Sequence, residues 1–207
     1  MFKHLLRILA YYCTPKKITM KKINILAALV LITGSAFAQA WTVDKSHAKL
    51  GFGITHMMLS EVDGSFKTFD ATITSSKDDL SDAVFEVSAD IAGINTDNEN
   101  RDNDLKSDKY FDAAKFAKLS FKSTSFKKVE GNKYKLTGDL TLKGITKPVD
   151  LDVVINGPIE HPRSKKKMIG LKASGSFKRT DFGIGGPGGA MLSEEVLLIA
   201  NGEFVKQ

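Results

Sequence analysis

The sequence predicts an all-β protein, an extended eight-stranded antiparallel β-barrel with a short helix that caps one end. Apolar and polar residues alternate in eight separate segments, which is the period of strands that bury one face. Many of these segments run to about ten residues, against a usual strand length of about five or six. Turn-forming residues separate several of them, at 130–132, 143–144 and 156–158. Eight strands of this length can close into a barrel with room for one small ligand, as lipocalins do.

Each predicted strand carries one apolar stripe, in which every second residue faces the same side of the sheet. The second stripe changes parity between Phe66 and Phe69, and an extra residue of this kind indicates a β-bulge. In chain order the stripes are Leu50, Phe52 and Ile54; Phe66, Phe69, Ala71 and Ile73; Phe85, Val87, Ala89 and Ile91; Leu119 and Phe121; Tyr134, Leu136, Gly138, Leu140 and Leu142; Val149, Leu151, Val153 and Ile155; Ile169, Leu171, Ala173, Gly175 and Phe177; Val196, Leu198, Ala200, Gly202 and Phe204.

A short helix is expected between the third and fourth stripes. Residues 96–99, Thr-Asp-Asn-Glu, match a capping box, in which the threonine oxygen and the glutamate carboxylate satisfy the first backbone donors of a helix. The helix is expected to run to about Lys106. Asp112 is expected to begin one further turn over residues 113–116.

The positive net charge of the chain belongs to its N-terminal segment. The 207 residues include 30 basic and 24 acidic side chains, a formal charge of +6. Six of the basic residues and none of the acidic ones lie before residue 39, so residues 39–207 are electrically balanced. A neutral domain has no bulk electrostatic attraction to phosphate backbones, and nucleic acid is therefore not an expected partner.

Residues 1–38 are predicted to be a leader that is removed on export. A basic start at Met20 precedes an unbroken apolar run over residues 25–32. Small residues follow, and the three parts together form a secretory signal peptide. We expect true translation to begin at Met20, with residues 1–19 as upstream sequence; a functional extended n-region over these residues is the alternative. Cleavage after Ala38 and cleavage after Ala40 both fit. The apolar run is shorter than the ~20 residues that span a bilayer. The rest of the chain is expected to form one domain in the periplasm or outside the cell.

The apolar stripes carry small residues near the middle of several strands, where a solid core would carry larger ones. These residues are Ala89, Gly138, Ala173, Gly175, Ala200 and Gly202. Small residues in register favour a hollow apolar lumen. The alternative is that the glycines are bends that let the barrel coil. The residues predicted to contact a ligand in the lumen are Leu50, Phe52, Ile54, His56, Phe85, Val87, Ala89, Ile91, Leu136, Gly138, Leu140, Leu151, Val153, Leu171, Ala173, Gly175, Phe177, Leu198 and Ala200.

Short motifs spread in order over the chain after the leader resemble one family. They are Trp41–Asp44 with Ser46–His47, Phe52–Met57, Gly64–Phe66, Arg101–Asp102, Leu105–Ser107, Tyr110–Asp112, Leu136–Leu142, Gly144–Val149 and Arg179–Gly183. The ordered set is similar to the YceI family of secreted lipid-binding proteins. The resemblance implies an eight-stranded, lipocalin-like barrel that binds long isoprenoid or amphiphilic chains in its pore, without an established catalytic activity. Family members often carry a histidine where this chain has Asp104, so any role of that histidine at the barrel mouth does not transfer.

The histidines and acidic residues do not predict a metal or catalytic site. His47 and His56 have opposite parity, so they are expected on opposite faces of one strand. His56 shares the face of the first stripe, and both a contact to a ligand head group and a hydrogen bond to nearby backbone stay open for it. The only cysteine, Cys13, lies in the leader, so no cysteine-based metal site is expected. The acidic residues over 97–104 are explained by the helix dipole. The pair Arg101–Asp102 is interpreted as a buried or half-buried tie between helix and barrel.

Two loops are interpreted as structural rather than catalytic. The run 183–188 matches G-x-G-x-x-G in form, but it lacks the strand and helix of a nucleotide site, and Pro187 removes a backbone donor. We expect a mobile loop there that could gate a barrel mouth. The basic run 163–167 is expected at a hairpin tip, where it could touch anionic head groups in a transient membrane-surface contact.

The function expected from these observations is that of a lipid carrier or store, and not that of an enzyme. A polyprenyl quinone, a fatty acid or a fatty amide would lie along the lumen as the ligand, and no cofactor is expected. Burial of methylenes at ~0.8 kcal/mol each would dominate the affinity. The alternative is a solid barrel that serves envelope assembly or stress tolerance through its surface. The identity of the lipid and the oligomeric state, a homodimer included, stay open.

Overall fold

A computed structural model describes residues 38–187 and 191–207; the predicted leader lies outside them apart from Ala38. Ten strands and one α-helix make up the described part. The elements are β1 (Gln39–His56), β2 (Ser60–Phe66), β3 (Phe69–Ser75), β4 (Val84–Asp90), β5 (Ile94–Asn95), α2 (Glu99–Lys106), β6 (Lys118–Glu130), β7 (Lys133–Leu142), β8 (Ile145–Glu160), β9 (Lys167–Lys178) and β10 (Leu192–Lys206), with 3-10 turns η3 (Ile91–Gly93) and η4 (Arg179–Phe182).

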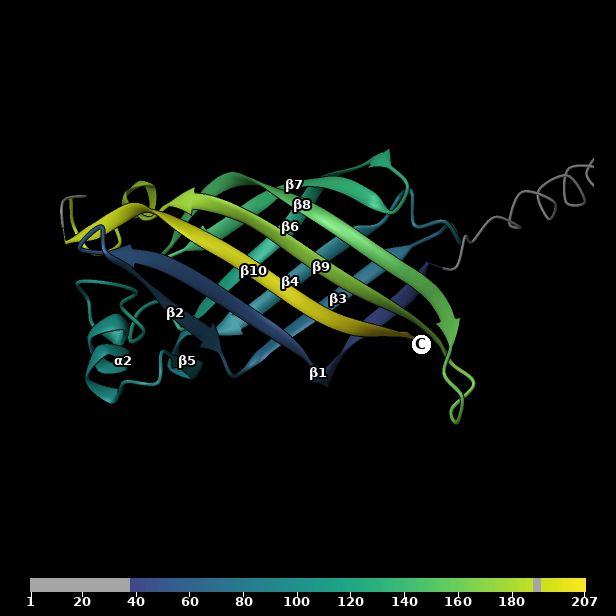
Figure 1. Ribbon diagram of the computed structural model, residues 1–207, viewed down its shortest axis with the longest axis horizontal. Coiled ribbons are helices and arrows are strands. Elements are labelled where there is room, and N and C mark those ends of the chain that lie inside the picture. The colour runs from purple at the N-terminus through teal and green to yellow at the C-terminus, as the bar shows by residue number, and fades with distance from the viewer. Residues whose placement is uncertain (1–37, 188–190) are drawn as a thin grey trace, which may run out of the picture. The chain divides into compact units, whose positions relative to one another are not determined.

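Eight of these strands close into one antiparallel barrel. Around the ring the order is β1-β10-β9-β8-β7-β6-β4-β3, and β3 pairs with β1 to complete it. Figure 1 shows the long strands running obliquely along the barrel wall. The predicted all-β fold of eight antiparallel strands, with a helix at one end, is confirmed.

Strand β1 is long enough to pair with two successive neighbours on one edge. Residues 39–42 pair with β3, and residues 50–56 pair with β2. Between β2 and β3 the chain leaves the sheet at residues 67–68, whose backbone groups bond instead to Gly93 and Asp90. The parity change that predicted a bulge is therefore a break between two strands. The break lets β2 diverge from β4 and pair only with β5 and β1 at the helix end.

Helix α2 begins later than the capping box predicts. Its N-cap is Asn98, whose side-chain oxygen accepts a hydrogen bond from the Arg101 backbone N–H. Thr96 lies outside the helix, and its hydroxyl donates to Asp102 instead. The predicted end at Lys106 is correct. Within the part of the chain that the structure describes, no helix has the length and apolar character to cross a bilayer.

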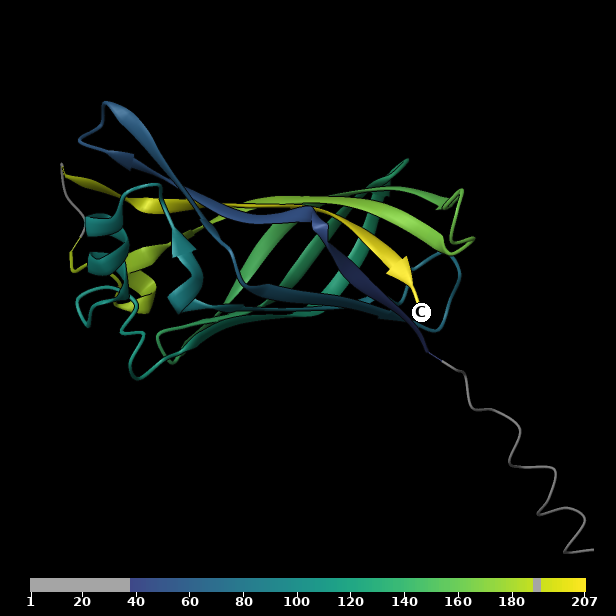
Figure 2. The ribbon, with the colours of Figure 1, turned by 90° about the horizontal axis from the view of Figure 1, so that it is seen from below.

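The single turn predicted after α2 is present. The Asp112 carbonyl accepts hydrogen bonds from the backbone N–H groups of Lys115 and Phe116. Figures 1 and 2 show α2 and the segment after it at one end of the barrel, while the C-terminus lies near the other end.

The end of the barrel near the C-terminus is filled by packed side chains. Trp41, Leu80, Ile155 and Ile169 are all buried there. Leu80 belongs to the loop between β3 and β4, which folds inward over this end. This part of the barrel is therefore a solid core.

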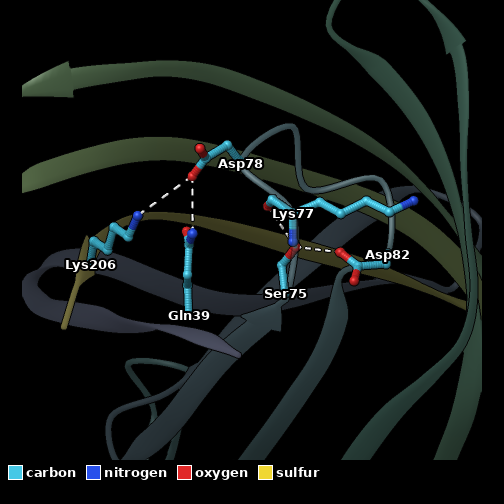
Figure 3. Close-up of polar contacts among 6 residues, drawn as sticks. All are labelled: Gln39, Ser75, Lys77, Asp78, Asp82 and Lys206. Atoms are coloured by element: carbon cyan, nitrogen blue, oxygen red, sulfur yellow. Dashed lines mark hydrogen bonds and ion pairs between the residues drawn. The ribbon is translucent and has the colours of Figure 1, made fainter. Parts of the chain in front are cut away.

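Polar contacts hold that β3–β4 loop against the strands (Figure 3). The Asp78 carboxylate accepts a hydrogen bond from Gln39 on β1 at 3.0 Å and lies 3.7 Å from the ammonium of Lys206 on β10. Ser75, at the end of β3, donates to the Asp82 carboxylate at 2.5 Å. The loop is thus tied to three strands, which keeps the C-terminal end of the barrel closed.

Candidate functional site

An internal cavity of about 910 Å³ runs inside the barrel from the helix end as far as Ile73 and Phe204, which pair with the packed-end residues Trp41 and Ile169. Its wall is made mainly of aliphatic and aromatic side chains. Several of these, including Leu50, Phe52, Leu151 and Leu198, face inward yet are only half-buried, because part of their surface borders the cavity. A cavity of this size and lining is in the range of sites for small molecules, about 300–1,000 Å³.

Fourteen of the nineteen residues predicted to contact a ligand line this cavity. They are Leu50, Phe52, Ile54, His56, Phe85, Val87, Leu136, Leu140, Leu151, Leu171, Ala173, Phe177, Leu198 and Ala200. They come from six different strands of the barrel, and strand parity alone brings them to one interior surface. Their contact with a ligand stays a prediction.

The other five predicted residues do not line the cavity. Ala89, Ile91 and Val153 are buried in the packed core, each at most 2% exposed. Gly138 lies beneath the Phe121 ring, which occupies the space that a side chain at 138 would need.

Gly175 is a close-approach glycine, because the Asp150 carbonyl oxygen and the Leu151 side chain lie where its Cβ would be. The hollow lumen therefore does not come from a continuous row of small residues. Ala173, Ala200 and Gly202 do border the cavity, whereas Gly138 and Gly175 make room for a neighbouring ring and a neighbouring strand. Gly175 is thus explained by the close approach of the neighbouring strand β8, and the alternative that such glycines let the barrel coil stays open.

Aromatic side chains near the helix end complete the wall and were not among the predicted contacts. The Phe66 ring lies 5.7 Å from that of Phe52 and 6.5 Å from that of Phe111, measured between centroids. Leu105 on α2 and Tyr110 in the turn after it also line the cavity. Strand parity could not find these last residues, since they lie in segments without a period of two.

Polar residues gather where the cavity reaches the surface, and sequence reasoning did not predict this rim. Asn98, Asn100, Asp104 and Lys109 are exposed and also line the cavity, so the cavity opens at the helix end. The mouth thus offers hydrogen-bonding and charged groups above an apolar interior.

Arg101 and Asp102 both hold Thr96. The Arg101 guanidinium donates to the Thr96 hydroxyl at 2.8 Å and to its carbonyl at 2.7 Å. The Asp102 carboxylate accepts from the Thr96 backbone N–H at 2.8 Å. The predicted tie is therefore between α2 and the segment before it, and each charged group acts through Thr96.

Arg179 fastens the glycine-rich segment, which also borders the mouth and whose Gly185 N–H donates to the Lys109 carbonyl at 3.0 Å. Arg179 is 3% exposed, and its guanidinium donates to the backbone carbonyls of Ile184, Gly186, Leu192 and Ser193 at 2.7–3.3 Å. The described part of the glycine-rich segment is therefore anchored, with Ile184 buried beneath it. The segment borders the mouth, as its proposed gating role requires, and the gating itself stays a prediction.

The two histidines of β1 lie on different sides of the barrel wall. His56 lines the mouth, whereas His47 is exposed beside Asp44 and Glu203. His47 Nδ1 lies 2.8 Å from Asp44 Oδ2 and 4.0 Å from Glu203 Oε2. The hydrogen bond to Asp44 raises the pKa of His47 above its usual value, and the same bond lowers the pKa of Asp44. A bulge between Val43 and Ala48 brings these groups out of the strand, away from the cavity.

The fold and the cavity together place the chain in the class of hollow, lipocalin-like antiparallel barrels. One end is packed, and the other opens through a polar rim into an apolar interior. Comparison with known proteins then gives the family. A profile of the YceI-like domain matches residues 41–204, and the chain belongs to the YceI-like family.

Proteins with similar sequence or structure match most of the length of this chain. Protein YceI of Salmonella newport (strain SL254) is 39% identical over 184 residues, which cover 88% of this chain and 95% of that protein. The crystal structure of Campylobacter jejuni YCEI protein is 30% identical with a TM-score of 0.65, covering 74% of this chain and 90% of that one. A polyisoprenoid binding domain from Saccharophagus degradans shares the fold, with 13% identity and a TM-score of 0.62, covering 81% of this chain and 98% of that one.

Proposed function

We propose that this protein binds a long-chain isoprenoid or another amphiphile in its barrel cavity, and carries or stores it in the periplasm or outside the cell. The observation that carries this proposal is the cavity of about 910 Å³, which combines an apolar interior with a polar mouth. The family and the structural similarity to a polyisoprenoid binding domain support a lipid ligand. The signal-peptide pattern before residue 39 supports export.

The cavity favours a ligand with a long apolar tail and a small polar head. Each methylene that leaves water contributes ~0.8 kcal/mol, so affinity should rise with chain length until the cavity is full. The head group would then lie at the rim, near Arg101, Lys109 and His56. The packed end sets the limit, because Trp41 and Leu80 block further penetration. A polyprenyl quinone, a fatty acid and a fatty amide all satisfy this description.

The role we propose is binding rather than catalysis. A solid barrel that acts only through its surface is the alternative, and it predicts no interior cavity. Stress protection would follow from sequestering or delivering such a lipid. A homodimer, which the sequence leaves open, is a further proposal, and light scattering of the purified protein tests it.

The experiment is native mass spectrometry on protein purified from its own host, followed by binding of a series of chain lengths to delipidated protein. We expect a bound lipid of defined mass. We also expect affinity that increases with each added unit and then reaches a plateau. Protein that carries no lipid and shows no dependence of affinity on chain length would contradict the proposal.

A further inference from the structure

The turn between β1 and β2 exposes large apolar side chains at the cavity mouth. Met57, Met58 and Leu59 are 47%, 72% and 84% exposed, and Met191 beside them is 61% exposed. We call these four residues the methionine tip. They make up nearly half of the nine exposed large hydrophobic residues in the described chain, so the exposure is concentrated here.

The backbone of the tip is unusual for these residue types. Met57 and Met58 have φ values of 53° and 55°, and the Leu59 N–H donates to the His56 carbonyl at 3.0 Å, which closes a turn with two left-handed central residues. Such hairpin turns strongly favour Asn-Gly, because left-handed backbone is unfavourable for residues with a Cβ. A turn that only reversed the chain would carry those residues. Methionines at these positions indicate that the side chains themselves have a use.

The tip stands on the rim of the cavity. The Met57 N–H donates to the Met191 carbonyl at 3.0 Å, which joins the hairpin to the start of β10. His56, the last residue of β1, and Met191, which directly precedes β10, both line the cavity mouth. Figure 2 shows this hairpin, in blue, projecting from the barrel at the same end as α2.

The basic run expected to touch membranes lies elsewhere. Residues 163–167 fall between β8 and β9, and Figure 1 shows that hairpin beside the C-terminus, at the packed end of the barrel. A contact there would leave the cavity mouth facing away from the membrane. The apolar rim is better placed for transfer of a lipid.

We propose that the methionine tip inserts into the surface of a phospholipid bilayer and holds the cavity mouth against it. An amphiphile could then pass between bilayer and cavity without exposing its chain to water. This inference rests on the proposed function. A convex apolar turn fits a bilayer, which needs no complementary shape, better than it fits a protein partner, which would have to supply a matching pocket. Its continuity with an apolar cavity is the second reason.

The test uses the protein without its predicted leader, residues 39–207, and vesicles of phosphatidylcholine. Changing Met57, Met58 and Leu59 together to serine should lower vesicle partitioning roughly tenfold or more. The matched control is Ile159→Ser near the packed end. Ile159 is 64% exposed, within the range of the three tip residues, and its change should leave vesicle partitioning unchanged. Equal partitioning of the triple variant and the control would overturn the proposal.

A reporter variant locates the contact directly. Leu59→Trp places a fluorophore on the tip, while the only native tryptophan, Trp41, is buried near the packed end. Vesicles with brominated acyl chains should quench the emission of the introduced tryptophan and leave Trp41 emission unchanged. Absence of quenching at the tip would contradict insertion, and dimerisation that is lost in the triple variant would assign the tip to a second copy of the chain.

The same variants separate this inference from the proposed function. The triple variant should bind a soluble amphiphile as tightly as the parent protein does, because its changes leave the cavity wall intact. If neither protein binds an amphiphile, the proposed function fails, whereas tip-dependent vesicle binding can still succeed. If both bind it and neither partitions onto vesicles, only the inference fails.

Discussion

Filling the cavity from its wall gives a direct test of where the ligand chain lies. Ala173 on β9 borders the cavity and pairs with Ala200 on β10 and with Val153 on β8. Two alanines side by side leave free volume at this point of the wall. Ala173→Phe would place a ring in that volume, across the path of a chain that enters from the helix end.

The magnitude follows from the carbon atoms that the ring displaces. Phenylalanine adds six carbons to alanine, and displacing as many methylenes of the ligand would cost up to about 5 kcal/mol at ~0.8 kcal/mol each. Since the chain can bend or withdraw, we expect a smaller loss of about 1.4–3 kcal/mol, which is about 10- to 150-fold in Kd. The optimum should also shift toward shorter chains.

The assay is binding of a chain-length series to delipidated protein, with Ser174→Phe as the control. Ser174 is the next residue of the same strand and is exposed on the outer face, so a ring there leaves the cavity unchanged. Unfolding curves would show that both variants are folded. Equal affinity and an unchanged chain-length optimum for Ala173→Phe and Ser174→Phe would refute the reasoning.

Three further outcomes follow from the packing and the charges. Gly138→Ala should lower the free energy of unfolding by about 1–3 kcal/mol, because its Cβ would overlap an aromatic ring, whereas Gly170→Ala, with no atom closer than 3.9 Å, should be nearly neutral in urea unfolding. In an NMR titration the pKa of His47 should lie above 6.5 and fall back in Asp44→Asn. The stability from this contact should be full between the usual pKa of aspartate and pH 6.5. It should be lost as pH rises through the raised pKa of His47 or falls through the lowered pKa of Asp44. A lysine at 179 cannot replace the four carbonyl contacts of the arginine, so Arg179→Lys should lower the free energy of unfolding by at least ~1.5 kcal/mol. Hydrogen exchange of the amides in the glycine-rich loop should also become faster. Unchanged exchange would mean that other contacts hold the loop.

The inward faces of the ring strands and their approximate positions could be predicted from the sequence, whereas the short strand β5 and the division of the second stripe between β2 and β3 could not. The alternation of residues 134–142 and 196–204 places their apolar members inside the barrel, as β7 and β10 show. This works because the side-chain period of a strand is two regardless of its partners. The same argument found fourteen residues of the cavity wall.

The helix start illustrates a local signal that was not sufficient. Residues 96–99 satisfy the capping box in sequence, but the hydroxyl of Thr96 is used by Asp102 and by the Arg101 side chain. Asn98 takes the capping role instead. Thr96 and Asn98 are both able to cap the helix. Which of them does so depends on the hydrogen-bond partners that the folded chain brings near each one, and the sequence of the segment alone does not specify those partners.

The sequence by itself determined the class of fold, the number of strands in the ring and the faces that point inward, because these depend on a local period. Only the tertiary structure decided where the barrel is hollow. Gly138 makes room for the Phe121 ring, and Gly175 makes room for the backbone of β8. Ala173 and Ala200, in contrast, border the open cavity. Which of these occurs depends on what lies across the barrel, and residues distant in the chain supply it. The packed end, the polar mouth and the methionine tip are likewise products of chain closure, which no local pattern encodes.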